Sequence, residues 1–242
     1  MNLFVISDLH FGFGKDKPMD VFGKNWEKHF LKIKESWENR VKNDDIVVVC
    51  GDISWALKEN DAISDLAFLN DLPGRKILLK GNHDLWWQSM SKFDALKRLN
   101  HFDTLEFLYN DAALLEKMNV SVCGTRGWKT PFDDDFSEAD VKTWRREVIR
   151  LEASLEKALK LGGEPIVFMH YPPFNMAKRE PTEMTDILEK YGIKKCYFGH
   201  IHNFGTTKYD ENKNLLPVFK KDGVEYYLTA CDYIEFSPQL VK

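Results

Sequence analysis

Short apolar runs and longer amphipathic stretches alternate along this chain. A short apolar run bounded by turn residues predicts a buried strand, and a stretch with apolar residues at helical spacing predicts a helix. Strands are expected at residues 2–7, 46–50, 76–80, 105–109, 112–117, 120–123, 166–169, 195–198, 215–220 and 224–230, and helices at residues 21–41, 60–69, 89–99, 137–161 and 182–191. Alternating strands and helices are typical of a layered α/β fold.

The longest expected helix, at residues 137–161, has the clearest boundaries. Ser137 is a residue type that caps helix N-termini, and a Gly-Gly-Glu-Pro sequence follows the last apolar position. Near the end of the chain, Asp222 and Gly223 separate two apolar runs, which predicts a hairpin.

Composition places the chain among ordinary globular proteins. Its 242 residues, 43% of them apolar and 30% charged, suit one α/β domain over residues 1–242. The net charge of -4 does not favour nucleic-acid binding, so any affinity for phosphate must be local. The chain begins with an apolar strand pattern, and no apolar run is long enough to span a membrane. We therefore expect a cytoplasmic protein without membrane contact, and we assign no oligomeric state.

The four cysteines lie within apolar runs and form no Cys-x-x-Cys pair; they are Cys50, Cys123, Cys196 and Cys231. We expect buried free thiols. A metal-ligand role for Cys50 is the disfavoured alternative, because oxygen ligands are available next to it.

Metal-ligating residue types follow five of the expected strands. The five blocks are Asp8 with His10, Asp52, Asn82 with His83 and Asp84, His170, and His200 with His202. They contain five of the seven histidines in the chain. In open α/β sheets, polar side chains beyond the carboxyl ends of the strands converge on one crevice. Any single block is more typical of an ordinary loop, but the five together predict one site.

A mixture of carboxylate and imidazole groups suits divalent manganese, iron or zinc. Two such ions about 3.5 to 4 Å apart can clamp a phosphoryl group and turn a bridging water into hydroxide. Asp52 is the candidate bridge, because a carboxylate has two oxygens that can bind different ions. The blocks therefore predict a hydrolase with two metal ions and a water-derived nucleophile.

These motifs resemble those of the calcineurin-like metallophosphoesterases. In that superfamily the order is Asp-x-His, Gly-Asp, Gly-Asn-His-Asp or Glu, a single histidine and Gly-His-x-His. The matching segments here are Asp8-Leu9-His10, Gly51-Asp52, Gly81-Asn82-His83-Asp84, His170 and Gly199-His200-Ile201-His202. The resemblance covers residues 8 to 202 and implies a four-layer αββα sandwich of two mixed β-sheets flanked by helices.

The resemblance also implies a role for each motif residue. The first metal would bind Asp8, His10, Asp52 and His202, and the second would bind Asp52, Asn82, His170 and His200. His83 would stay free of metal and serve the leaving oxygen as a general acid or hydrogen-bond donor, with Asp84 orienting its imidazole. The alternative for His83 is a third ligand of the second metal.

Departures from the motifs of particular subfamilies narrow the substrate class. Ile53, Ser54 and Trp55 follow Asp52, so the Asp-Arg-Gly extension of protein Ser/Thr phosphatases and symmetrical diadenosine tetraphosphatases is missing. Trp55 stands where purple acid phosphatases carry a tyrosine ligand, and an indole cannot bind metal. His83 stands where lipid-precursor pyrophosphatases often carry arginine, which weakens that assignment.

Two further residues are candidates for substrate contact. Arg126 follows an expected strand, so its guanidinium could bind a substrate phosphate; the equally weighted alternative is an ion pair with one of Asp133, Asp134 or Asp135. Trp86, together with Trp87, could form an aromatic wall for a nucleobase or sugar, or simply pack the start of a helix.

The expected function is hydrolysis of phosphomono- or phosphodiester bonds in a small phosphorylated or nucleotide-like substrate. A nuclease or a nucleotide pyrophosphate hydrolase on the same site is the runner-up. A nuclease would need a stripe of Lys and Arg beside the site, and the runs Lys178-Arg179 and Lys220-Lys221 are short. The alternative of another class is a non-catalytic, metal-binding scaffold.

Overall fold

The structure, a computed structural model, describes every residue except 14–16, 206–207 and 242. Its strands form two sheets. The first sheet contains β1 (Leu3–Ile6), β2 (Ile46–Val49), β3 (Arg75–Leu78), β4 (Leu105–Phe107) and β11 (Gln239–Leu240), in the order β11-β1-β2-β3-β4. The second contains β5 (Ala112–Leu115), β6 (Val120–Thr125), β7 (Glu164–Met169), β8 (Lys195–Phe198), β9 (Phe219–Lys221) and β10 (Val224–Leu228), in the order β5-β6-β7-β8-β10-β9.

Both sheets are parallel in their centre and antiparallel at an edge. Strands β1 to β4 pair in parallel, and β11 joins β1 in antiparallel orientation. Strands β6, β7, β8 and β10 also pair in parallel, while β5 and β9 are antiparallel edge strands. This confirms the expected pair of mixed sheets, and it brings the carboxyl ends of the parallel strands to a common edge in each sheet.

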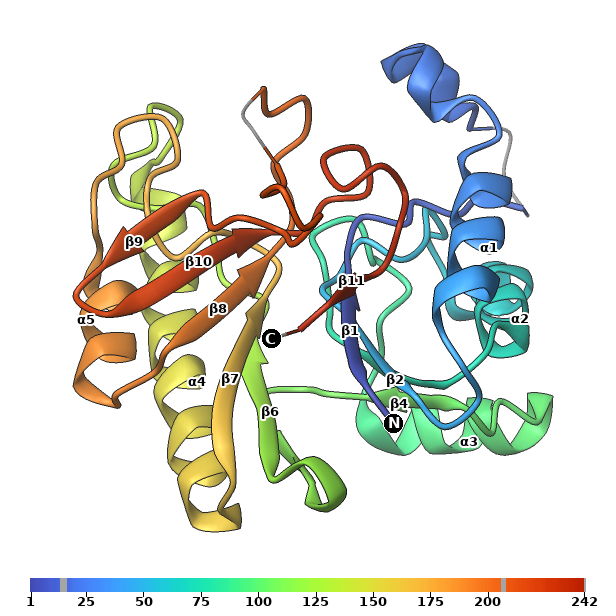
Figure 1. Cartoon of the computed structure of the whole chain (residues 1–242), viewed down its shortest axis with the longest axis horizontal. Helices are drawn as coiled ribbons and strands as arrows, with labels where there is room; N and C mark the ends of the chain where they lie inside the picture. Colours follow the sequence, from blue (N-terminus) through green and yellow to red (C-terminus); the bar gives the residue numbers. More distant parts are fainter. Residues whose placement is uncertain (14–16, 206–207, 242) are drawn as a thin grey trace.

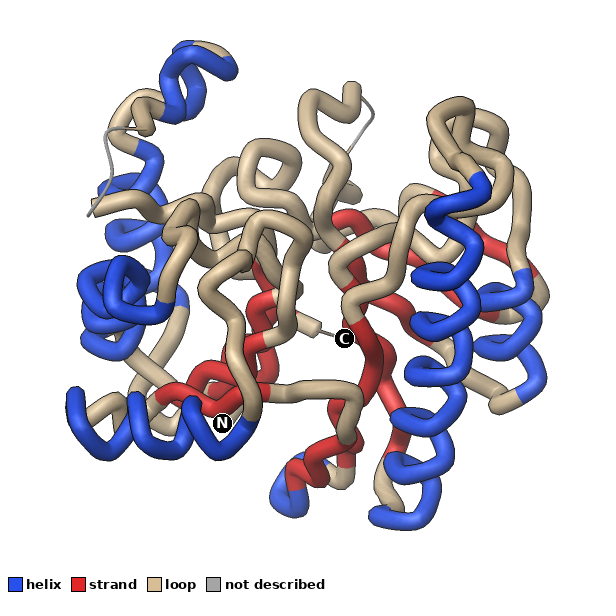
Figure 2. The backbone as a smooth tube through the Cα atoms, turned by 180° about the vertical axis from the view of Figure 1, so that it is seen from behind, coloured by secondary structure: helices blue, strands red, loops and turns tan. Residues whose placement is uncertain are grey.

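Helices cover the outer faces of the two sheets (Figures 1 and 2). The helices are α1 (His29–Arg40), α2 (Ile63–Asp71), α3 (Met90–Asn100), α4 (Glu138–Leu161) and α5 (Glu183–Lys190). Helices α1 and α2 lie beside the first sheet, and α4 and α5 lie beside the second. In the described residues, no helix is both long and apolar enough to cross a bilayer.

Alternation along the strands separates two hydrophobic cores. In β2, Val48 belongs to the core between the sheets, which also contains Val5, Ile77 and Phe168. The neighbouring Val47 belongs to the larger core beneath the helices. Successive side chains of a strand point to opposite faces, so an uninterrupted apolar run is what a strand buried on both faces requires. All four cysteines are buried free thiols, as predicted.

The expected helix at residues 21–41 is shorter in the structure. Two 3-10 turns, η1 (Met19–Phe22) and η2 (Lys24–Trp26), precede α1, which begins only at His29. Gly23 separates the two turns with a φ of 135° and a ψ of 153°, a conformation that cannot continue a helix. The two-residue strand β11 was also absent from the sequence prediction, because so short a segment has no detectable periodicity.

Candidate metal centre

The five predicted blocks meet where β1, β2, β3, β7 and β8 end. The Asp8 amide donates to the Gly51 carbonyl at 3.0 Å, and the His10 amide donates to the Asp52 carbonyl at 2.9 Å. The His200 amide donates to the Asp8 carboxylate, at 3.0 Å from Oδ2. Loops from both sheets are therefore held together by hydrogen bonds between the motif residues themselves.

Four of the predicted ligand residues have left-handed backbone. The φ values are 58° for Asp8, 47° for His10, 52° for Asp52 and 69° for His200. Positive φ is uncommon for residues with a Cβ, and such conformations concentrate at functional sites where the surrounding structure enforces them. The strand ends therefore turn sharply, and this turn directs the side chains toward the common edge.

The glycines of three motifs are explained by close packing. A Cβ on Gly51 would lie 2.6 Å from the Gly81 nitrogen, and a Cβ on Gly81 would collide with the Asp52 side chain and backbone. A Cβ on Gly199 would collide with Ser7 and with the Asp8 carboxylate. These positions accept only glycine because the loops touch one another directly.

The ligand atoms assigned to the first metal lie close together. His10 Nε2 is 3.4 Å from His202 Nε2 and 3.8 Å from Asp52 Oδ2. Asp8 Oδ1 lies 3.7 Å from His202 Nε2 and 4.0 Å from His10 Nε2. Asp8, His10 and His202 thus offer atoms spaced closely enough to hold one ion.

A second group of closely spaced ligand atoms comes from Asp8, Asp52 and His170. His170 Nε2 lies 2.7 Å from Asn82 Oδ1 and 3.4 Å from Asp52 Oδ2. The His200 ring lies with its centroid 5.1 Å from that of His170. Asp52 Oδ2 therefore lies within 4 Å of a ring nitrogen of His10 and of His170.

Hydrogen bonds fix which nitrogen each of two imidazoles presents to the centre. His170 Nδ1 lies 3.0 Å from the Cys50 carbonyl, so it donates there and leaves Nε2 as the free nitrogen. His202 Nδ1 lies 2.9 Å from Asp232 Oδ1, which orients the ring in the same way. A carboxylate behind a metal-ligating histidine raises its basicity and fixes its tautomer. Asp232 was missed in the sequence because it follows no motif and lies 30 positions from His202.

Burial shifts the pKa values of the carboxylates and imidazoles in the centre. It raises the pKa of Asp8 to about 6, and together with the charge of Asp8 it raises the pKa of Asp52 well above its usual range. Burial also lowers the pKa values of His10 and His170 well below the ordinary value. The imidazoles of His10 and His170 are therefore neutral, and each has a lone pair available to bind a metal ion.

His202 is the exception among these imidazoles. Burial acts to lower its pKa, but the hydrogen bond with Asp232 and the charge of Asp8 together raise it above the ordinary value.

This combination fits divalent cations. The ion-pair partners that the structure gives Asp8 and Asp52 are histidine rings. The pKa of His202 alone is raised, and the neutral rings of His10 and His170 do not offset the cost of burying carboxylates. A divalent ion would offset that cost and would use the free imidazole nitrogens as ligands. The donor set is therefore suited to ions of the manganese, iron and zinc type.

The structure places His83 beside this centre and Asp84 beneath it. His83 Nε2 lies 4.0 Å from Asp52 Oδ2, with 43% of its side chain exposed. Its ring packs against Trp55, with centroids 4.3 Å apart. Asp84 is fully buried and accepts hydrogen bonds from the amides of Ile53, Ser54 and Gly81 and from Trp86 Nε1. These hydrogen bonds hold the loops together, and the orientation of the His83 imidazole by Asp84 stays a prediction.

Arg126 pairs with a different carboxylate from the three that were predicted as its alternative partners. Its guanidinium lies 3.8 Å from Glu147 Oε1 and over the Trp128 ring, at 4.7 Å from the centroid. The surface carboxylates considered for it have other partners: Asp134 and Asp135 pair with Lys178 and Lys129, and Asp133 accepts from the Thr130 amide and Asn175. The side chain is 18% exposed, and contact with a substrate phosphate stays a prediction.

Trp86 does not form an aromatic wall. It is fully buried, and its Nε1 donates to Asp84 Oδ1 at 3.0 Å. Trp87 is only 7% exposed and packs on Phe93 and Phe107. The prediction of a substrate-stacking Trp86 is therefore wrong, and the packing alternative describes both tryptophans.

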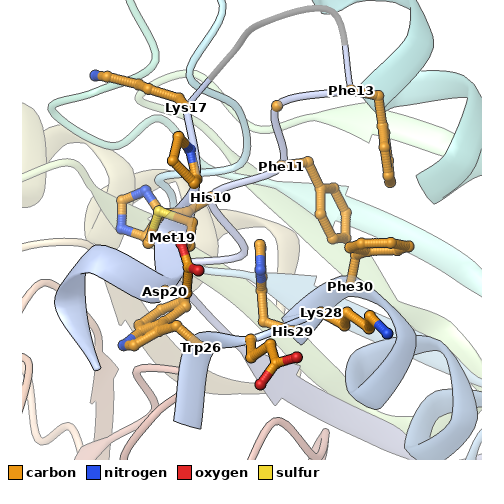
Figure 3. Close-up of a pocket in the computed structure, with 13 residues that line it drawn as sticks. His10, Phe11, Phe13, Lys17, Met19, Asp20, Trp26, Lys28, His29 and Phe30 are labelled. Carbon is orange, nitrogen blue, oxygen red and sulfur yellow. The ribbon is translucent and has the colours of Figure 1, made fainter. Parts of the chain in front are cut away.

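Two cavities border the centre. One, of about 400 Å³, is lined by His10 together with Phe11, Trp26, His29 and Phe30 (Figure 3). The other, of about 620 Å³, is lined by His200 together with Trp128 and Tyr171. The Tyr171 ring lies over that of His200, with centroids 3.9 Å apart. Both cavities are of a size that holds a small organic ligand.

Comparison with solved structures supports the fold. Phosphopantetheinyl hydrolase from Mycobacterium tuberculosis aligns with a TM-score of 0.59 at 15% identity, covering 99% of this chain and 95% of that chain. The protein TT1561 from Thermus thermophilus aligns with a TM-score of 0.58 at 10% identity, covering 99% of this chain and 97% of that chain. At such low identity the similarity concerns the fold alone.

Sequence comparison gives information beyond the fold. The gene 66 proteins of Mycobacterium phages L5 and D29 are 35% identical over 83 residues and 32% identical over 114 residues. The matches cover 34% and 47% of this chain but only 40% and 55% of those proteins, so the chain spans about half the length of these relatives. The family model of calcineurin-like phosphoesterases matches residues 1–204, most of the chain. The chain therefore belongs to the calcineurin-like phosphoesterase family.

Proposed function

We propose that the chain hydrolyses phosphomono- or phosphodiester bonds of small phosphorylated or nucleotide-like substrates with a pair of divalent ions. One observation carries the proposal: Asp52 Oδ2 lies close to both His10 Nε2 and His170 Nε2, at 3.8 and 3.4 Å. A carboxylate in this position can serve two ions at once, because each of its oxygens has lone pairs to offer.

The chain's own residues divide into two ligand sets. Asp8, His10 and His202 would hold one ion, and Asn82, His170 and His200 would hold the other, with Asp52 shared by both. When bound, such ions supply a water-derived nucleophile and positive charge for the phosphoryl oxygens. His170 and His202 donate through Nδ1 to the Cys50 carbonyl and to the Asp232 carboxylate. These hydrogen bonds support the assignment, because both leave Nε2 free to bind an ion.

His83 is the residue best placed to assist the leaving oxygen. Its side chain is 43% exposed, whereas Asp52 and His170 are buried, and its Nε2 lies 4.0 Å from Asp52 Oδ2. Contact with Trp55 limits the motion of the ring. The imidazole can therefore donate a hydrogen bond to a substrate oxygen without giving up a metal ligand.

Turnover of synthetic esters tests this proposal. The purified protein is stripped of metal and assayed on an aryl phosphomonoester and on the matching bis-aryl diester, with manganese, iron, zinc or magnesium added back singly. We expect at least one transition metal to restore hydrolysis, and the preferred ester directs the search for the natural substrate. A folded protein that hydrolyses neither ester with any metal would contradict the proposal and favour the non-catalytic scaffold.

A His83→Gln variant separates chemistry from metal binding. Loss of a general acid or donor typically costs 10²- to 10⁴-fold in rate. We expect a loss of roughly that size with the metal content of the wild type. His101→Asn is the matched control, because His101 is exposed at the end of α3, where its φ of 55° also suits asparagine. Unchanged turnover in His83→Gln would remove His83 from the mechanism.

A further inference from the structure

A third, smaller cavity lies beside the metal centre and is lined by cationic side chains. It has a volume of about 170 Å³ and lies between the ends of β3 and β6, the segment after β4, and helix α4. Its polar lining consists largely of Lys80, Arg126, Arg146 and Arg150, together with Tyr109 and Asn110. Four cationic side chains around so small a space are unexpected in a chain whose net charge is -4.

One carboxylate contacts three of these cations. Glu147 Oε1 lies 2.7 Å from Arg150, 3.8 Å from Arg126 and 3.9 Å from Arg146. Its other oxygen, Oε2, accepts a hydrogen bond from Thr125 Oγ1 at 2.6 Å. Four cations against one carboxylate leave an excess of three positive charges, so the protein itself does not neutralise the cavity.

The donors of the cavity are also incompletely used. Arg126 Nε is buried and has no hydrogen-bond partner among the described residues. A buried donor without a partner is costly, and that cost falls when an acceptor binds.

The cavity adjoins the metal centre through the backbone. The Arg126 carbonyl accepts hydrogen bonds from the amides of His170 and Tyr171, at 3.2 and 2.9 Å. Lys80 directly precedes the Gly81-Asn82 pair. Two walls of the cavity are thus continuous with the segments that carry Asn82 and His170, the ligands proposed for the second ion.

We propose that this cavity, the cationic pocket, binds a second anionic group of the substrate, a phosphate or a carboxylate, distinct from the phosphoryl group that is hydrolysed. Pockets for whole small molecules usually measure about 300 to 1,000 Å³, so this one suits a single compact group. Guanidinium groups bind phosphate and carboxylate oxygens through paired hydrogen bonds. The proposal rests on the proposed function and adds to it a substrate class, that of esters with two separate anionic groups.

Matched pairs of synthetic ligands test this inference. Alkanediol bisphosphates of increasing chain length are compared with alkyl monophosphates of the same length, and with phosphoalkanoates that carry a carboxylate in place of the second phosphate. Affinity for the metal-loaded protein is measured by calorimetry and by inhibition of bis-aryl diester hydrolysis. We expect at least one doubly anionic ligand to bind about tenfold or more tightly than its monophosphate, since charge-assisted hydrogen bonds have this strength.

Three variants assign the effect to the cationic pocket. The quantity compared is the affinity for a doubly anionic ligand divided by the affinity for its matched monophosphate. In Arg146→Gln/Arg150→Gln this ratio should fall toward one. Lys80→Gln should reduce it as well, and it leaves the contacts of Glu147 intact, so it remains informative if the double variant folds poorly. Arg145→Gln is the control: it removes the same charge from the neighbouring position of α4, which is exposed and does not line the cavity.

The outcomes separate this inference from the proposed function. Equal affinity for every matched pair in the wild type would overturn the inference, even with rapid diester hydrolysis. An equal loss in Arg145→Gln would overturn it too, because only general charge would then matter. Calorimetry that shows the advantage in a protein without turnover would support the pocket and contradict the proposed function. The better-bound member among bisphosphates and phosphoalkanoates identifies the second group.

Discussion

On the side of the metal centre that includes His10, the neighbouring side chains are aromatic, whereas the side that includes His170 borders the cationic pocket. Trp55 stacks on the His10 ring, with centroids 4.7 Å apart, and Trp26 meets it edge-on at 5.9 Å. Beyond His170, by contrast, lie Arg126 and the other cationic side chains around Glu147. Aromatic side chains therefore border the metal centre on one side, and cationic side chains lie near it on the other.

This difference indicates that the two sides of the centre have different roles. The aromatic side fixes a ligand by packing: Trp26 is 2% exposed and also contacts His202, with centroids 5.5 Å apart. The cationic side chains are partly exposed, and ion pairs of this kind contribute little to stability. We infer that the aromatic side maintains the geometry of the first ion, while the cationic side is available for binding the substrate.

The largest change in stability is expected from a substitution on the aromatic side. Trp26→Ala removes a buried indole, and substitutions of this kind cost about 3–5 kcal/mol of unfolding free energy because they leave a cavity. Chemical denaturation measures the change. Val21→Ala, in the preceding turn where Val21 is 73% exposed, is the control and should change stability by less than about 0.5 kcal/mol. Equal stability of Trp26→Ala and wild type would contradict a structural role for this side.

A smaller effect is expected from the carboxylate behind His202. Asp232→Ala removes the hydrogen bond that orients the imidazole, and losses of this type reduce metal affinity about 10- to 100-fold. Metal titration of the stripped protein measures it. Asp232→Asn retains an oxygen acceptor and should restore part of the affinity. If Asp232→Ala binds metal as tightly as the wild type, the contact has no positioning role.

The smallest effect on stability is expected on the cationic side. Arg146→Gln removes a side chain that is 50% exposed and lies 3.9 Å from Glu147, so the loss should stay below about 1 kcal/mol. The same denaturation experiment measures it beside Trp26→Ala. A loss as large as that of Trp26→Ala would show that the cationic cluster is structural, and the contrast between the two sides would fail.

Much of the centre could be predicted from the sequence because each motif residue directly follows a strand. Parallel strands bring their carboxyl ends to one edge, so Asp8, Asp52 and His170 meet even though they are far apart along the chain. The fold was predictable for the same reason, since apolar runs such as residues 46–50 identify strands that are buried on both faces.

The remaining features depend on contacts that no local pattern encodes. Asp232 reaches His202 only through the folding of the final segment. Trp86 turns inward because Asp84 accepts its Nε1 hydrogen, a contact that the motif itself does not specify. The cationic pocket combines Lys80 with Arg146 and Arg150 of α4, and on the helix alone the two arginines look like an ordinary solvated face. Such features require the tertiary structure.

A titration of the metal-stripped protein with manganese tests the central claim most directly. Bis-aryl diester hydrolysis and bound metal are measured together as manganese is added, in the wild type and in Asp52→Asn. We predict that the wild-type rate reaches its maximum at two bound ions per chain. The folded variant should lose roughly a thousandfold in rate, the size of loss expected when a group that stabilises transition-state charge is removed. A wild-type rate independent of manganese, or an Asp52→Asn variant with the full rate, would contradict a two-ion centre bridged by Asp52.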